Sequence, residues 1–251
     1  MKLAMLSDIH ANLHALQACL DHAQAQGVDQ WVFLGDLVGY GANPSEVLNS
    51  VMTLVDQGAW VIQGNHDAMA VSPPQQSESL GSSTAAWTHA QLNKAQRAFL
   101  QERPLFMQHA HLFLVHASAQ DPDKWHYVDS DRAATLCLKA AQTQHAGIQH
   151  VFVGHVHQQY LYYPGAGRGL MAFKPTPGVA VPCPATRAAV VTVGSVGQPR
   201  DGDPRAMYAM YDLEAARLTF HRVAYDHTAA AAAIMAAGLP VFFANRLETG
   251  R

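Results

Sequence analysis

Five short apolar runs in this sequence are each followed at once by side chains that can bind a metal ion. The runs are LAML, WVFL, WVIQ, LFLV and VFV. The candidate ligands that follow them are Asp8, His10, Asp36, Asn65, His116, His155 and His157. In α/β folds the crevice lies beyond the carboxyl ends of the strands, so residues after five strands can meet at one point. We therefore expect these seven side chains to form one site.

The chemistry of this set favours a pair of transition-metal ions. Carboxylate and amide oxygens mixed with imidazoles suit Mn²⁺, Fe²⁺ or Zn²⁺, with Co²⁺ and Ni²⁺ as further candidates, whereas Ca²⁺ prefers oxygens alone. Two dications beside the carboxylates of Asp8 and Asp36 leave a positive pocket that attracts phosphate. Such a pair can deprotonate a shared water, which then attacks phosphorus in line with the leaving group. The set predicts a hydrolase.

Each fragment alone has a simpler interpretation. Asp8-x-His10 is also a cap followed by a surface ring, Gly35-Asp36 is also a turn, and a single histidine such as His116 is more often structural. Gly154-His155-x-His157 is moderately specific for a metal site, and Gly64-Asn65-His66-Asp67 is more specific. Their recurrence in this order, each at a strand end, favours the metal site.

The order of these motifs resembles the calcineurin-like metallophosphoesterase superfamily, over residues 1 to about 212. The resemblance implies a four-layer αββα sandwich of two mixed sheets flanked by helices. It also implies one metal held by Asp8, His10, Asp36 and His157, and a second held by Asp36, Asn65, His116 and His155. His66 would then donate a proton to the leaving group, while Asp67 either orients that ring or satisfies backbone groups.

Residues 194–204, with Arg200, are similar to a stretch of one small bacterial branch of the superfamily. Arg200 would bind a substrate phosphate as a bidentate donor, or it pairs with Asp201 or Asp203 in a tight loop. Likewise, Gly39-Tyr40-Gly41 either frames the pocket or turns the chain, and we favour the turn.

The substrate is predicted only by class. Protein phosphatases and symmetrical dinucleoside tetraphosphatases of the superfamily carry an Arg soon after the second Asp motif, and Gly35-Asp36-Leu37-Val38-Gly39-Tyr40-Gly41 has none. We favour a phosphodiester or nucleotide over a phosphomonoester, with a dinucleoside polyphosphate or a phosphoprotein as alternatives. An inactive scaffold would show broken motifs, and a zinc amidohydrolase would not explain Asn65 as a ligand.

The elements that must position these residues alternate between strand and helix. We expect one α/β domain over residues 1–251, with more strands in its C-terminal half. Expected strands are 2–6, 31–34, 60–63, two within 105–115, 150–153, 188–193, 206–211 and 218–223. Expected helices are 13–23, 44–58, 83–102, 131–144, 229–237 and a last one through 245–248. Residues 164–184, rich in Pro and Gly, are a surface insertion or a flap in which Arg168 and Lys174 contact phosphate.

Composition excludes several classes of protein. With 14% charged residues, a net charge of -3 and no Lys/Arg run, the chain lacks a nucleic-acid-binding patch. Three scattered cysteines do not form a disulfide framework or a CxxC zinc site. The N-terminal apolar run is broken at Ser7 and Asp8 and is too short for the core of a signal peptide, and no apolar stretch is long enough to span a membrane. We expect a cytoplasmic enzyme for a small phosphorylated substrate, and the sequence does not predict an oligomeric state.

Overall fold

Strand β1 (Lys2–Leu6) buries both of its faces, and each face packs into a different core. Leu3 and Met5 belong to an apolar cluster that includes Leu112 and Leu114 of a second sheet. Ala4 and Leu6 instead pack against helix residues on the other side of β1. Because successive side chains of a strand point to opposite faces, this alternation places β1 between a helical layer and a second sheet.

The computed structural model describes residues 1–76, 80–167 and 169–251. Two mixed sheets of six strands each are found there. The first sheet has the order β3 (Trp60–Val61), β2 (Gln30–Phe33), β1, β11 (Ala206–Asp212), β12 (Arg217–Val223) and β9 (Val181–Pro182). The second has the order β4 (Phe106–His109), β5 (Leu112–Val115), β6 (His150–Val153), β10 (Ala189–Val193), β7 (Gln159–Pro164) and β8 (Leu170–Phe173).

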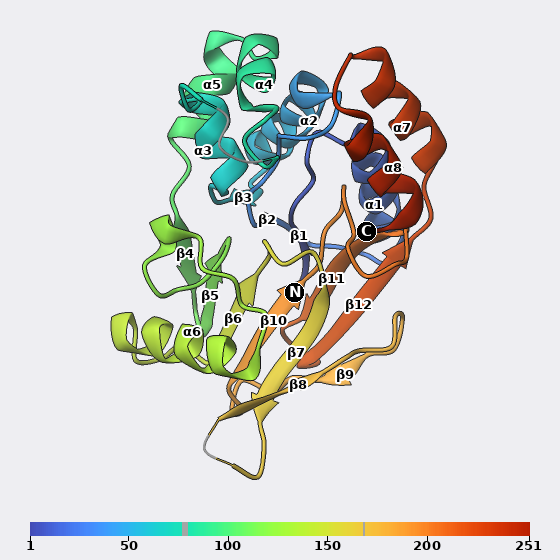
Figure 1. The fold of residues 1–251 in the computed structure, drawn as a ribbon. Helices are drawn as coiled ribbons and strands as arrows, with labels where there is room; N and C mark the ends of the chain where they lie inside the picture. Colours follow the sequence, from blue (N-terminus) through green and yellow to red (C-terminus); the bar gives the residue numbers. More distant parts are fainter. Residues whose placement is uncertain (77–79, 168) are drawn as a thin grey trace.

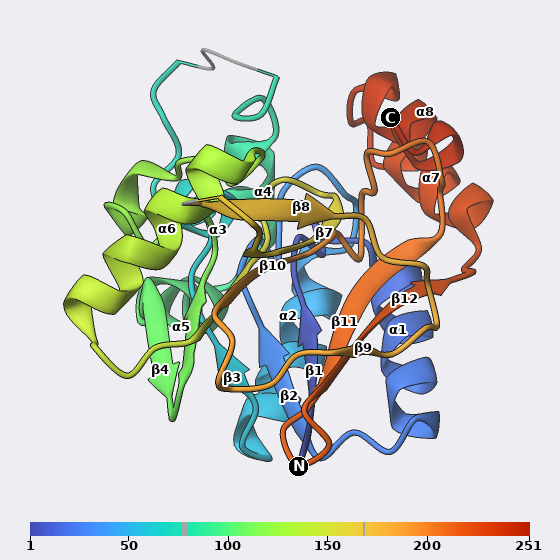
Figure 2. The same ribbon diagram turned by 90° about the horizontal axis from the view of Figure 1, so that it is seen from below.

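Helices flank the two sheets. They are α1 (Leu13–Ala25), α2 (Pro44–Asp56), α3 (Asn65–Val71), α4 (Ala85–Gln91), α5 (Lys94–Gln101), α6 (Asp131–Gln144), α7 (His227–Ala236) and α8 (Val241–Thr249). α1 and α2 pack on the first sheet and α6 packs on the second. Figure 1 shows the chain order of these elements, and Figure 2 shows α6 and α1 on opposite sides of the strands. The expected four-layer sandwich is confirmed.

Parallel strands in each sheet set the position of the site. β1 pairs in parallel with β2, and β2 with β3. In the second sheet, β6 pairs in parallel with both β5 and β10. The carboxyl ends of neighbouring parallel strands lie at the same edge of a sheet, so the loops after these strands gather at one edge.

Residues 83–102 were expected to be helical, and most of them are. The structure has two helices there, α4 and α5, with a break at Leu92 and Asn93. Asn93 caps α5, because its side chain accepts the N–H of Gln96 at 2.9 Å while the Gln96 side chain accepts the Asn93 N–H at 3.0 Å. This reciprocal pair satisfies two backbone donors that a continuous helix would have bonded internally.

The Pro- and Gly-rich residues 164–184 carry the short strands β8 and β9, which pair with β7 and β12. Lys174 is exposed, and Arg168 lies outside the described residues. None of the described residues from 165 to 184 lines the cavity at the candidate active site. Within the described ranges, no helix combines the length and apolarity needed to span a membrane.

Candidate active site

Loops from both sheets supply the side chains of the candidate site. The loops after β1, β2 and β3 carry Asp8, His10, Asp36 and Asn65, and those after β5 and β6 carry His116, His155 and His157. Hydrogen bonds join the loops of the two sheets, for example from the His155 N–H to Asp8 Oδ2 and from the Val196 N–H, after β10, to the Ser7 carbonyl, both 2.9 Å long. All seven predicted ligands therefore come to one place.

A first cluster contains Asp8, His10 and His157, whose potential ligand atoms lie within 4.8 Å of one another. His157 Nε2 is 3.1 Å from His10 Nε2 and 3.1 Å from Asp8 Oδ1. Asp36 Oδ2 lies 3.8 Å from His10 Nε2. These are the four residues expected around one metal.

A second cluster contains Asp36, His116 and His155, whose potential ligand atoms also lie within 4.8 Å of one another. His116 Nε2 is 3.3 Å from Asp36 Oδ2, 3.2 Å from Asn65 Oδ1 and 3.2 Å from His155 Nδ1. Asp36 Oδ2 thus faces both clusters, as a bridging carboxylate would.

The hydrogen bonds behind the histidines fit metal ligation. Nδ1 of His10, His116 and His157 lies 3.3, 2.7 and 2.6 Å from the carbonyls of Val38, Leu34 and Gln198. A carbonyl only accepts, so each Nδ1 carries a proton, and in the neutral form of each ring Nε2 keeps a lone pair.

The Nε2 atoms of His10 and His157 lie 3.1 Å apart with their lone pairs facing each other. This arrangement needs a cation between the two nitrogen atoms. Asp8 Oδ1, buried without a hydrogen-bond partner, points to the same need.

Burial controls the protonation of the site. It lowers the pKa of His10 and lowers that of His155 to about 3, which keeps both rings in the neutral form that binds metals. Burial also opposes the charge of His116, but the Asp36 carboxylate outweighs it and raises the pKa of His116 to about 9. A cation that binds His116 therefore displaces a proton.

Five of the seven predicted ligands have a left-handed backbone. Their φ angles are 53° for Asp8, 49° for His10, 52° for Asp36, 65° for His155 and 56° for His157. Non-glycine residues in this region cost about 1–3 kcal/mol each and persist where the surrounding structure imposes them, commonly at functional sites. The concentration of such residues marks this point of the fold as functional.

Two glycines allow the ligand loops to approach closely. A Cβ on Gly64 would collide with the backbone nitrogen and Oδ1 of Asp36, and one on Gly154 would collide with Ser7 and Asp8. The glycines before Asn65 and His155 are therefore required by packing.

His66 lies at the N-terminus of α3, between the clusters and Tyr40. Its backbone N–H donates to Asp36 Oδ1 at 2.7 Å, and its ring contacts Tyr40 at 4.3 Å between centroids. Asp67 does not orient this ring. Its carboxylate accepts the backbone N–H groups of Leu37, Val38 and Gly64, at 2.9, 3.2 and 3.0 Å, so it holds the loop after β2.

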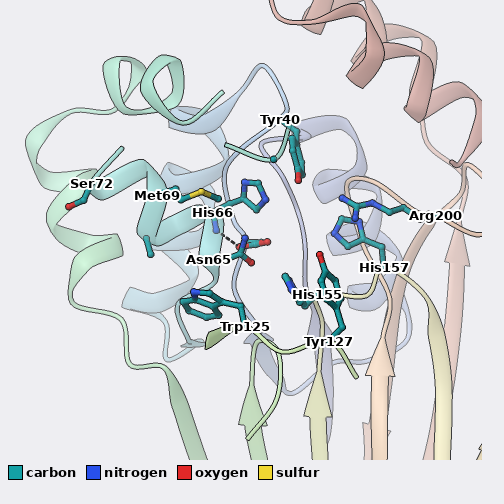
Figure 3. A pocket seen from close by; sticks show the side chains of 13 residues that line it. Tyr40, Asn65, His66, Met69, Ser72, Trp125, Tyr127, His155, His157 and Arg200 are labelled. Atoms are coloured by element: carbon teal, nitrogen blue, oxygen red, sulfur yellow. Dashed lines mark hydrogen bonds between the residues drawn. The ribbon is translucent and has the colours of Figure 1, made fainter. Parts of the chain in front are cut away.

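A cavity of about 500 Å³ opens beside the two clusters. Figure 3 shows Tyr40 and His66 on one side of it, Trp125 and Tyr127 on the opposite side, and Arg200 next to His157. Tyr40 lines the cavity, although we had favoured a simple turn for Gly39-Tyr40-Gly41. Tyr40, Trp125 and Tyr127 were not predicted as site residues. The only sequence signal for them is that Tyr40 follows Asp36 by four residues, and that Trp125 and Tyr127 follow His116 by nine and eleven residues.

Arg200 is held by groups other than its neighbouring aspartates. Its Nη2 donates to Gln198 Oε1 at 2.9 Å, and Arg246 of α8 donates to the same oxygen at 3.0 Å. Asp201 pairs with Arg222, while Asp203 pairs with Arg205 at 2.7 Å. The α7–α8 hairpin also packs Phe243 on Tyr40, at 4.8 Å between centroids. The C-terminal helices therefore support one wall of the cavity, a role that the sequence did not indicate.

Comparisons with known proteins agree with this geometry. The family model described as the calcineurin-like phosphoesterase superfamily domain matches residues 1–216. A crystal structure of a metallophosphoesterase from Sphaerobacter thermophilus is 33% identical, with full coverage of both chains and a TM-score of 0.86.

Two further proteins are similar over their whole length. A hypothetical protein from Pyrococcus horikoshii OT3, known from its crystal structure, is 19% identical with a TM-score of 0.77, and the match covers 100% of this chain and 98% of that one. An uncharacterized protein of Methanocaldococcus jannaschii is 28% identical over 99% of this chain and 98% of its own length. These two extend the similarity beyond residue 216, into the C-terminal helices.

Proposed function

The chain belongs to the calcineurin-like phosphoesterase superfamily and is a phosphoric ester hydrolase, and we propose that it uses two divalent cations to hydrolyse phosphodiester or nucleotide substrates. One cation would be held by Asp8, His10, Asp36 and His157, and the other by Asp36, Asn65, His116 and His155. The observation that carries this proposal is the pair of buried clusters that share Asp36. Bound there, two cations supply a nucleophilic hydroxide near neutral pH and neutralise phosphoryl oxygens.

His66 is the proposed proton donor to the leaving oxygen. The ring lies at the cavity wall, and its Nδ1 lies against Gly39, where a Cβ would meet it at 2.7 Å. This contact leaves Nε2 as the atom that transfers the proton. The hydrogen bond from the His66 N–H to Asp36 fixes the start of α3, so the ring keeps its place relative to the clusters.

Arg200 is the proposed phosphate-binding side chain. Its guanidinium lines the cavity, and both nearby aspartates are paired with other arginines, so neither competes with a substrate anion for it. Gln198 holds the guanidinium in place through a neutral oxygen, which leaves its charge available to the substrate.

Replacing Arg200 by Met should lower kcat/KM by about 10- to 100-fold, because a hydrogen bond to a charged group is lost. Steady-state kinetics on the preferred substrate measures this. Arg132→Met, on the exposed face of α6, is the matched control and should leave kcat/KM unchanged. If Arg200→Met behaves like the control, Arg200 does not bind the phosphate.

Hydrolysis with defined metals tests the function itself. The purified protein is stripped with a chelator, reloaded separately with Mn²⁺, Fe²⁺, Zn²⁺, Co²⁺ and Ni²⁺, and assayed on phosphodiesters, nucleotides, phosphomonoesters and dinucleoside polyphosphates. We expect activity only after reloading, and the highest kcat/KM on a phosphodiester or nucleotide. A protein that binds two metals per chain but cleaves none of these esters would be a scaffold rather than an enzyme.

The compartment proposed for this reaction is the cytoplasm. Its support is the state of Cys19, Cys137 and Cys183, which are all free and buried. Proteins of reducing compartments typically keep their cysteines as thiols.

A further inference from the structure

The cavity is larger than a phosphoryl group requires. Its volume of about 500 Å³ falls in the range of about 300–1,000 Å³ that small-molecule sites occupy. A phosphate beside Asp36 and His157 would fill only the part of the cavity nearest the two clusters. Under the proposed function, on which this inference rests, the remaining space must receive the organic group of the ester.

Two aromatic rings from one loop line this space. Trp125 and Tyr127 lie between β5 and α6, on the side of the cavity opposite Tyr40 (Figure 3). Tyr127 is 53% exposed, and its ring stacks on that of His155 at 4.1 Å with an interplanar angle of 22°. Trp125 meets the His116 ring edge to face at 5.8 Å. One side of each ring is thus held by a predicted metal ligand.

The loop that carries the two rings is fixed at both ends. Ala119 and Val128 are buried, and Ala119 accepts a hydrogen bond from the Gln144 side chain at 3.1 Å through its carbonyl. Trp125 itself has φ of 55°, a left-handed backbone that a bulky residue rarely adopts. Such strain persists where contacts with the surrounding structure impose the conformation, often at ligand sites. The two rings are therefore held in a fixed position before a ligand binds.

We propose that Trp125 and Tyr127 form an aromatic platform on which a planar ring of the substrate stacks, so that the enzyme prefers phosphate esters of nucleosides. Indole and phenol faces stack on nucleobases through their π-systems, whatever the base. A sugar or a short alkyl group offers no such face. The platform therefore determines specificity for the organic group, separately from the groups that bind phosphate.

The test compares two ligands that differ only in the base. Manganese-loaded protein is titrated calorimetrically with adenosine 5′-monophosphate and with ribose 5-phosphate. We expect the nucleotide to bind about 10- to 100-fold more tightly, as for one stacked base. Trp125→Ala should abolish this preference without changing the affinity for ribose 5-phosphate, whereas Trp125→Phe should retain most of it. Phe173→Ala, an exposed ring on β8 outside the cavity, is the control.

Several results would overturn the platform. Equal affinity of the wild type for the two ligands, or no binding of either, would show that no base is stacked. A Trp125→Ala variant that weakens both ligands equally would show that Trp125 only covers His116. The hydrolysis assays distinguish this failure from failure of the proposed function. Base preference without hydrolysis contradicts only the function, and hydrolysis without base preference contradicts only the platform.

Discussion

Replacing Asp36 by Asn should remove both metals and lower kcat/KM by at least about 10³-fold. Asp36 Oδ2 is the oxygen that faces both clusters, at 3.3 Å from His116 Nε2 and 3.8 Å from His10 Nε2. Asparagine preserves the shape of the side chain and its acceptor for the His66 N–H, but it removes the negative charge that two cations would share. The variant should therefore lose its metals while it still folds like the wild type.

The measurements are metal stoichiometry by elemental analysis, thermal unfolding and steady-state kinetics. Asp21→Asn is the matched control, since Asp21 is exposed on α1 and interacts only locally, accepting a hydrogen bond from Gln17 at 2.8 Å. It should keep two metals and full activity. An Asp36→Asn variant that still binds two metals per chain would contradict the bridging role, and one that loses a single metal would restrict Asp36 to one cluster.

Replacing His66 by Ala should lower kcat by about 10²- to 10⁴-fold while both metals stay bound, the effect expected for loss of a general acid. The ring lies 4.9 Å from that of His10, and within residues 1–76, 80–167 and 169–251 no backbone carbonyl accepts a hydrogen bond from it, as one does for His10, His116 and His157. A substrate with a better leaving group, such as a p-nitrophenyl ester, should be affected less, because its leaving oxygen needs no proton.

Metal content decides between this role and ligation. A potential ligand atom of His66 lies within 4.8 Å of those of His10 and Asp36, so the ring is close enough to join a metal site. If His66→Ala loses a metal, His66 is a ligand and the assignment as proton donor is wrong. His126→Ala, an exposed ring on the loop that carries Trp125, is the control and should change neither kcat nor metal content.

The tertiary structure accounts for features that local sequence patterns left open. The Asn93-x-x-Gln96 pair is a capping box that can be read in the sequence, but the expectation of helix over residues 83–102 did not include the break between α4 and α5. Asp67 is next to His66 in the chain, yet its carboxylate turns to the backbone of Leu37 and Val38. Proximity in sequence did not determine the partners of Asp67, because Leu37 and Val38 lie about thirty residues before it in the chain.

The sequence by itself determined the class of fold and the donor atoms, because both depend on local order. A strand is recognised by its own apolar run, the parallel arrangement brings strand ends to one edge, and the type of donor atom that Asp, Asn or His offers is fixed by the residue itself. Only the tertiary structure decided which loops form the cavity wall. Tyr40, Trp125 and Arg200 come from three distant segments, and Arg246 supports Arg200 from the last helix. Their distances follow from how the two sheets and the C-terminal hairpin pack, and no short-range pattern encodes that packing.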